Sequence, residues 1–329
     1  MHPFPALRRA QRDVLVTPKD QRREVGEPLE PRPSPLAIVT AAGLGDTRTE
    51  PRLLVYARPV ERVEIGGLAI AYERRGHGPP LLLLHGGMGD HREWRQQLDG
   101  LSDGFTVVAW DAPGCGASSD PPETFRMADY ADSLTGLIEA LGLGRPHVLG
   151  LSWGSTLALE LYRRRPEIPR SLALTAAYAG WAGSLPPEEV TRRLERLLEQ
   201  IERPAHEWVR EYVPTLLAER APAETATELE TIMADSRPAG LRPMLLAMAE
   251  ADLRDVLPTI SVPTLLLYGE EDARSPRDVA EQMHAAIPDS TLVVLPGVGH
   301  QANVEAPEAF NETVRTFLRT GDEAEGTRE

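Results

Sequence analysis

Cysteine and lysine are almost absent from this chain of 329 residues, and their scarcity excludes several kinds of chemistry. Cys115 is the only cysteine, so no internal disulfide can form and nothing indicates an oxidising compartment. We therefore expect a cytoplasmic protein. Lys19 is the only lysine among 35 basic residues and lies near the N-terminus, which excludes Schiff-base catalysis and Ser–Lys dyads in a folded core.

Long apolar runs and an excess of positive charge are also missing. No run approaches the roughly 18 apolar residues that span a bilayer. The formal net charge of −15 repels phosphate backbones and anionic membrane surfaces, so we expect neither nucleic acid nor a membrane as a partner. No histidine or acidic cluster has metal-ligand spacing, and the sequence predicts no metal and no cofactor.

The two ends of the chain differ from its middle. Residues 1–60 hold 9 of the 30 prolines and have 10 basic against 7 acidic side chains. Because prolines at this density prevent helices and little can be buried, we expect a flexible extension, with one strand near Leu53–Tyr56. Residues 321–329 are expected to form a disordered tail.

From about residue 61 short apolar runs alternate with amphipathic segments. Runs that are apolar throughout are typical of strands buried on both faces of a parallel sheet. The expected strands are Leu68–Glu73, Leu81–His85, Thr106–Asp111, His147–Ser152, Ser171–Thr175, Thr264–Tyr268 and Thr291–Leu295. The expected helices between them are His91–Leu101, Met127–Leu141, Ser155–Arg165, Pro276–Ala286 and Pro307–Leu318. This alternation predicts a doubly wound, mostly parallel α/β sheet over residues 61–180 and 259–320.

Residues 181–258 interrupt the alternation with helical patterns only. So long a segment cannot be a loop in a compact domain, and we expect a helical cap inserted between two strands, a natural place to shape a substrate pocket. The expected helices of this cap are Val190–Ile201, His206–Leu217, Ala223–Met233 and Leu241–Ala249.

The end of one predicted strand carries a Gly-x-Ser-x-Gly motif, formed by Gly150, Ser152 and Gly154. In a strand–turn–helix context this motif presents a nucleophilic serine above the sheet, with its backbone strained towards positive φ. The two glycines are required because a Cβ on either would come too close to the turn. The backbone N–H of Trp153, at the start of the following helix, can bind a developing oxyanion.

Two later strand ends supply a base and an acid. Elimination of the other seven histidines leaves His300, in a glycine-rich loop after the last strand, as the base. Asp272 follows the preceding strand, in the chain order Ser, Asp, His that marks this architecture. It is expected to orient the imidazole, while Glu270 and Glu271 are neighbouring alternatives that we expect to be solvated.

The first apolar strand ends in His85-Gly86-Gly87-Met88-Gly89. We expect the N–H of Gly87, with Met88 as an alternative, to be the second oxyanion donor, and His85 to hold the turn. Met88, Tyr178 and Trp181 are expected to line an apolar substrate pocket. Asp111, at the end of the next strand, is expected to stabilise its own turn.

Residues 61–319 resemble the α/β-hydrolase superfamily. The stretches Ala249–Pro258, Gly269–Asp272 and His300–Pro307 resemble 3-oxoadipate enol-lactonases and their relatives, which implies hydrolysis of a small ester or lactone through an acyl-enzyme. A nucleophilic aspartate, as in haloalkane dehalogenases and epoxide hydrolases, is excluded by Ser152.

A second, local resemblance connects Ser152–Leu159 and Gly114-Cys115-Gly116 to proline iminopeptidases. The chain departs from that pattern at Met88 and at Asp111-Ala112-Pro113-Gly114, where those enzymes typically have His-Gly-Gly-Pro-Gly and Asp-Gln-Arg-Gly turns. The sequence therefore favours a serine esterase or lactonase, with aminopeptidase action and non-hydrolytic ligand binding as the alternatives.

Overall fold

Eight strands form the sheet of the described residues, and six neighbouring strands among them pair in parallel. The computed structural model describes residues 60–326, so the predicted extension and its strand near Leu53–Tyr56 lie outside the described residues. The order of the sheet is β1-β2-β4-β3-β5-β6-β7-β8. Its strands are β1 (Glu61–Ile65), β2 (Leu68–Arg75), β3 (Pro80–Leu84), β4 (Thr106–Trp110), β5 (His147–Leu151), β6 (Ser171–Thr175), β7 (Thr264–Gly269) and β8 (Ser290–Leu295). The predicted doubly wound, mostly parallel α/β fold is confirmed.

The first strand, β1, was not predicted. It pairs antiparallel with β2 through a tight turn at Gly66 and Gly67, where both φ angles are positive. The glycine pair between two alternating segments is a hairpin signal. Most side chains of β1 are exposed or half-buried, so this strand lacks the apolar run on which the other predictions rested.

Successive side chains of the central strands enter two separate cores. Leu82 and Leu84 belong to one core, and Leu81 and Leu83 to the other, because side chains alternate across a strand. Helices α2 (Met127–Ala140), α3 (Trp153–Arg164) and α9 (Arg277–Ala286) contribute to the first core. Helices α1 (Arg95–Leu101), α10 (Ala302–Glu305) and α11 (Pro307–Gly326) contribute to the second, and a 3-10 turn, η1 (His91–Trp94), precedes α1.

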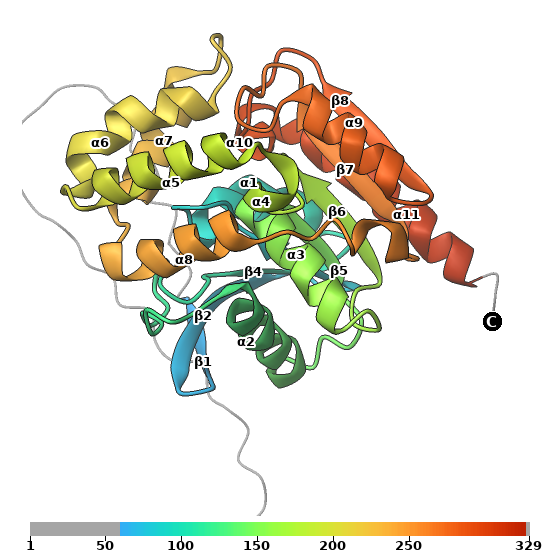
Figure 1. Ribbon diagram of the computed structural model, residues 1–329. Helices are drawn as coiled ribbons and strands as arrows, with labels where there is room; N and C mark the ends of the chain where they lie inside the picture. The colour runs from blue at the N-terminus through green and yellow to red at the C-terminus, as the bar shows by residue number, and fades with distance from the viewer. Residues whose placement is uncertain (1–59, 327–329) are drawn as a thin grey trace, which may run out of the picture. The chain divides into compact units, whose positions relative to one another are not determined.

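The segment between β6 and β7 is entirely helical in its regular structure, and we call residues 181–259 the insertion. It contains α4 (Trp181–Ser184), α5 (Pro187–Ile201), α6 (Ala205–Tyr212), η2 (Val213–Leu216), α7 (Ala223–Ala234), α8 (Pro238–Glu250) and η3 (Leu257–Thr259). In Figure 1 its helices α5, α6 and α7 lie together, in yellow-green and yellow. They add no strand to the sheet.

The last helix is longer than the sequence predicted. It continues to Gly326, so most of the segment expected to be a disordered tail, 321–329, is helical, and residues 327–329 lie outside the described residues. Within residues 60–326 no helix combines the length and apolarity that a membrane crossing requires.

Candidate active site

Ser152 occupies a strained turn between β5 and α3. Its φ of 52° and ψ of −109° are rare for a residue with a side chain and cost about 1–3 kcal/mol. Glycines flank it for a steric reason: a Cβ at Gly150 would lie 2.4 Å from the Gly154 carbonyl oxygen, and one at Gly154 would lie 2.2 Å from that of Leu84. The turn thus requires both glycines, as the motif predicted.

His85 holds the loop after β3 in place through contacts of both its ring nitrogens. The Nδ1 atom of His85 lies 2.8 Å from the Gly86 carbonyl oxygen, and the backbone N–H of Ala112 donates to Nε2 at 3.0 Å. Because Nε2 accepts, Nδ1 carries the proton. Burial lowers the pKa of His85, which keeps this imidazole neutral. His85 therefore has the structural role expected of it.

Met88 turns the same loop towards the insertion. Its φ is 69°, and its carbonyl oxygen accepts a hydrogen bond from the Ser236 hydroxyl at 3.1 Å. Neither the Gly87 N–H nor the Trp153 N–H has a hydrogen-bond acceptor among residues 60–326. Two unused backbone donors therefore lie at residues that line the same cavity as Ser152.

His300 is paired with Asp272. Its Nδ1 lies 2.9 Å and 3.0 Å from the two carboxylate oxygens, and both side chains are almost completely buried. The backbone N–H groups of Arg274 and Ser275 donate to Asp272 Oδ1 at 2.9 Å and 2.8 Å. These donors fix the carboxylate, which in turn fixes the tautomer and the plane of the imidazole.

The backbone around His300 is anchored on the insertion, which the sequence did not reveal. The His300 N–H donates to the Leu216 carbonyl oxygen at 2.8 Å. The half-buried carboxyl of Glu305 accepts from the N–H groups of Ala218 at 2.8 Å and Gly299 at 3.1 Å. Burial raises the pKa of Glu305 despite these donors. A lone glutamate five positions after a histidine gives no recognisable sequence signal, so this link emerges only from the fold.

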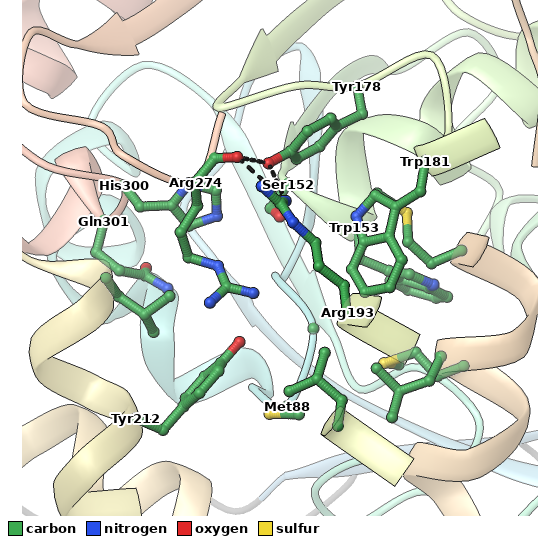
Figure 2. A pocket seen from close by; sticks show the side chains of 16 residues that line it. Met88, Ser152, Trp153, Tyr178, Trp181, Arg193, Tyr212, Arg274, His300 and Gln301 are labelled. Carbon is green, nitrogen blue, oxygen red and sulfur yellow. Dashed lines mark hydrogen bonds between the residues drawn. The ribbon is translucent and has the colours of Figure 1, made fainter. Parts of the chain in front are cut away.

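Ser152 and His300 face one cavity, whose lining combines strand-end loops with the insertion (Figure 2). Its lining residues are Gly87, Met88, Ser152, Trp153, Tyr178, Trp181, Arg193, Leu197, Tyr212, Leu216, Met244, Leu245, Met248, Arg274, His300 and Gln301. The structure thus places all three predicted pocket residues, Met88, Tyr178 and Trp181, in this lining. Two arginines, Arg193 and Arg274, were not anticipated, because arginines are frequent in this chain and nothing in their spacing separates these two.

Comparison with known proteins shows which family the chain belongs to. The model of the alpha/beta hydrolase fold family matches residues 79–307. The chain belongs to the α/β-hydrolase family. The sequence-based prediction of a hydrolase from this family is thereby confirmed.

Three similar proteins show the kinds of activity that are named among relatives of this α/β-hydrolase. A pimeloyl–acyl-carrier-protein methyl ester esterase from Nitrosomonas europaea is 29% identical, covering 74% of this chain and 96% of that protein. A thermophilic esterase from Thermogutta terrifontis, solved with malate bound, is 33% identical with a TM-score of 0.73, covering 79% of this chain and 99% of that one. The enol-lactonase from Burkholderia xenovorans shares the fold, with a TM-score of 0.71 at 23% identity over 79% of this chain and 100% of that one.

Asp111 and the two glutamates considered as alternative acids have other surroundings in this α/β-hydrolase. Glu270 and Glu271 are exposed, as expected. Asp111 is fully buried, and its Oδ1 lies 2.7 Å from Nδ1 of His91 while its Oδ2 accepts the Ala117 N–H at 2.8 Å. Of these acids only Asp272 is bonded to His300.

Asp90 adjoins this second pair and forms with His91 and Asp111 a buried cluster in which one atom from each side chain lies within 4.8 Å of the others. The cluster has the residue types of a metal site, which spacing alone did not indicate. Its carboxylates already accept protein donors, however. Asp90 binds the guanidinium of Arg92 through both oxygens, with contacts of 2.7–3.1 Å, and Asp111 is bonded as described above. We therefore assign the cluster a structural role.

Proposed function

We propose that this α/β-hydrolase cleaves a carboxylic ester or lactone through an acyl-enzyme, with Ser152 as nucleophile, His300 as base and Asp272 as the residue that orients the base. The observation that carries the proposal is the position of the Asp272-bound imidazole, which lines the same cavity as a serine on a strained glycine-flanked turn. A turn of this cost is retained where it serves a site.

In the proposed first half-reaction, the Ser152 Oγ attacks the acyl carbon while Nε2 of His300 takes its proton. Asp272 accepts the Nδ1–H and stabilises the resulting imidazolium. The N–H groups of Gly87 and Trp153, with Met88 as the alternative to Gly87, hold the oxyanion, and none of these N–H groups has an acceptor among residues 60–326.

The tetrahedral intermediate then collapses. The C–O bond to the alcohol breaks, and the alcohol leaves with the proton from His300. Water next donates a proton to His300 as its oxygen attacks the acyl carbon, which releases the acid and restores Ser152. No cofactor is required for these steps.

The lining of the cavity favours this proposal over aminopeptidase action. A free substrate amine is cationic at neutral pH and needs an acidic partner. None of the described lining residues is Asp or Glu, whereas two are arginines. Such a lining opposes a cationic group and accepts a polarised or anionic one. The names of the esterase and enol-lactonase relatives agree with acyl chemistry at oxygen.

The test is turnover of 4-nitrophenyl acetate by the wild type and by Ser152→Ala. We expect Ser152→Ala to lower kcat by about 10⁴–10⁶-fold with an unchanged melting temperature, because the hydroxyl is removed and no packing group is lost. Ser133→Ala, the same change on α2 outside the cavity lining, is the matched control and should keep full activity.

A fluorophosphonate should label Ser152 in the same preparation, located by peptide mass spectrometry. Full activity of Ser152→Ala, or an adduct on another residue, would refute the assignment. Binding of small esters without any turnover would instead identify a ligand-binding protein.

A further inference from the structure

The cavity beside Ser152 has an electrostatic character opposite to that of the whole chain. The formal net charge of the protein is −15, yet among the described residues that line the cavity the only side chains of fixed charge are the guanidinium groups of Arg193 and Arg274. A concave site with one sign of charge concentrates ligands of the other sign. The cavity is therefore suited to an anion even though the protein as a whole repels one.

Arg274 has a firmly held backbone. Its N–H donates to Asp272 Oδ1 at 2.9 Å, and its carbonyl oxygen accepts the Tyr178 hydroxyl and Nη1 of Arg193, the latter at 3.3 Å. Because three side chains fix the main chain at this point, the Arg274 side chain starts from a defined position two residues from the acid of the proposed triad.

The guanidinium of Arg274, by contrast, is left without an anion. It makes no hydrogen bond or ion pair with any residue in the described part of the chain, and it lies over the Tyr212 ring in a cation–π contact, 5.0 Å from the ring centroid. The side chain is half-buried, and Figure 2 shows it extending into the middle of the cavity. A partly desolvated cation without a counterion is unfavourable, and it gains most from a ligand that supplies one.

A neighbouring arginine shows that this arrangement is specific to the cavity. Arg277, three residues further on, is exposed on α9 and pairs with Glu281 at 2.8 Å. The more exposed cation thus has an acidic partner where water would suffice, and the more buried one has none among residues 60–326.

Arg193 comes from the insertion and reinforces the positive charge. Its Nε pairs with Glu189, and its Nη1 donates to the Tyr178 hydroxyl at 3.2 Å as well as to the Arg274 carbonyl oxygen. Since Glu189 offsets its charge in part, Arg193 mainly braces the insertion against the Arg274 segment. Arg274 is the group that remains available to a ligand.

We propose that the substrate of this hydrolase carries a carboxylate, which the guanidinium of Arg274 binds while the ester or lactone carbonyl lies at Ser152. The inference rests on the proposed function for its chemistry, but the anion site itself is independent of turnover. A planar guanidinium offers two parallel N–H donors that match the two oxygens of a carboxylate.

Binding can be tested without catalysis in the Ser152→Ala protein, titrated calorimetrically with malonate, succinate, glutarate and adipate. We expect at least one of these dicarboxylates to bind, more weakly as salt is added. Adding Arg274→Gln should weaken that binding about 10- to 100-fold, whereas Arg274→Lys, which keeps the charge and loses the fork, should give an intermediate affinity. Arg277→Gln is the matched control and should change nothing. A lack of binding by all four, or equal binding with and without Arg274, would overturn the proposal.

Turnover gives the second test. Wild-type kcat/KM for monomethyl glutarate should exceed that for dimethyl glutarate, its uncharged counterpart, by about tenfold or more, and Arg274→Gln should reduce this ratio mainly through KM for the charged ester. Equal hydrolysis of both esters, abolished by Ser152→Ala, would overturn the anionic-substrate proposal and leave the proposed function intact. Dicarboxylate binding that depends on Arg274, together with turnover that survives Ser152→Ala, would support the anion site and overturn the proposed function.

Discussion

Two histidine–aspartate pairs in this molecule have nearly the same internal geometry. His300 Nδ1 lies 2.9 Å from Asp272, and His91 Nδ1 lies 2.7 Å from Asp111. Both imidazoles are largely buried, and both aspartates accept backbone N–H groups in addition. Judged by these distances and by burial alone, either aspartate could orient its histidine as a general base.

The surroundings of the pairs differ. His300 lines a cavity together with Ser152 and two unused backbone donors, whereas His91 is not among the residues that line that cavity. Burial alone would lower the pKa of His91, but the hydrogen bond and the charge of Asp111 outweigh it and raise the pKa. Asp90 and its ion-pair partner Arg92 lie beside His91, and these two neighbours are charged side chains, neither of them a serine like Ser152. The difference teaches that a hydrogen-bonded aspartate does not by itself identify a base, and that the proposal for His300 rests on the cavity that it lines together with Ser152.

Replacing the two histidines should separate these roles most clearly. His300→Ala is expected to lower kcat by about 10⁴–10⁶-fold with little change in melting temperature, because the proposed base is removed. His91→Ala should keep kcat within about tenfold of the wild type and lower the free energy of unfolding by about 1–3 kcal/mol, because Asp111 loses a buried donor. Steady-state kinetics and urea unfolding measure both quantities. The opposite pattern would exchange the roles of the two pairs.

The aspartates should show the same contrast with a smaller effect on rate. Asp272→Asn preserves the shape but presents the wrong partner to Nδ1, and we expect kcat to fall by about 10³–10⁴-fold. Asp111→Asn should instead destabilise the protein by about 1–3 kcal/mol and spare kcat. A large loss of kcat in both variants, measured at a temperature where each is folded, would count against a purely structural role for the second pair.

A third carboxyl, Glu93, extends the comparison to a group that has no hydrogen bond or ion pair to a basic side chain among residues 60–326. It lies on the same short helix as His91 and accepts the Gly86 N–H at 3.1 Å, and its other oxygen has no hydrogen-bond partner among the described residues. Burial raises its pKa to about 8, the Gly86 N–H partly opposes this, and the charge of Asp90 adds to the increase.

This raised pKa predicts a dependence of stability on pH. Glu93 ionises freely in the unfolded chain near its ordinary value of 4.5 and only near 8 when folded. The protonated Glu93 carboxyl therefore adds its full contribution to the free energy of unfolding below about pH 4.5. This contribution is lost as the pH rises towards 8, by up to about 1.4 kcal/mol per pH unit. Glu93→Gln should flatten this part of the curve, so its stability relative to the wild type should rise from pH 5 to pH 8. Parallel wild-type and variant curves in urea unfolding at pH 5, 6.5 and 8 would contradict the prediction.

Much of the fold could be predicted because its signals are local. The apolar runs of β3 and β7 and the glycines around Ser152 each state a physical requirement within a few residues of sequence. The strand ends of a parallel sheet meet at one edge, so the order Ser152, Asp272, His300 was enough to predict a common site. The short β1 was missed because none of its side chains is fully buried and its signal is the glycine pair that follows it.

The remaining features depend on contacts that no local pattern encodes. Arg274 was missed because its significance lies in the acid that it lacks, and an absent partner leaves no mark in the sequence. The pairing of His91 with Asp111 joins residues on different elements. Asp111 was expected to stabilise its own turn, and its bond to the Ala117 N–H agrees with that, but its histidine partner became visible only in three dimensions.

The hydrogen bond from the His300 N–H to the Leu216 carbonyl oxygen, with Glu305 bridging Gly299 and Ala218, makes the insertion a support for the proposed base as well as a wall of the cavity. One segment thus contributes both to the lining of the proposed substrate pocket and to the backbone support of the proposed base. A redesign that replaces the helices of the insertion to change selectivity would have to preserve the turn at 216–218. Without that turn, the backbone of His300 would lose its hydrogen bond to Leu216, and the position of the imidazole would no longer be fixed.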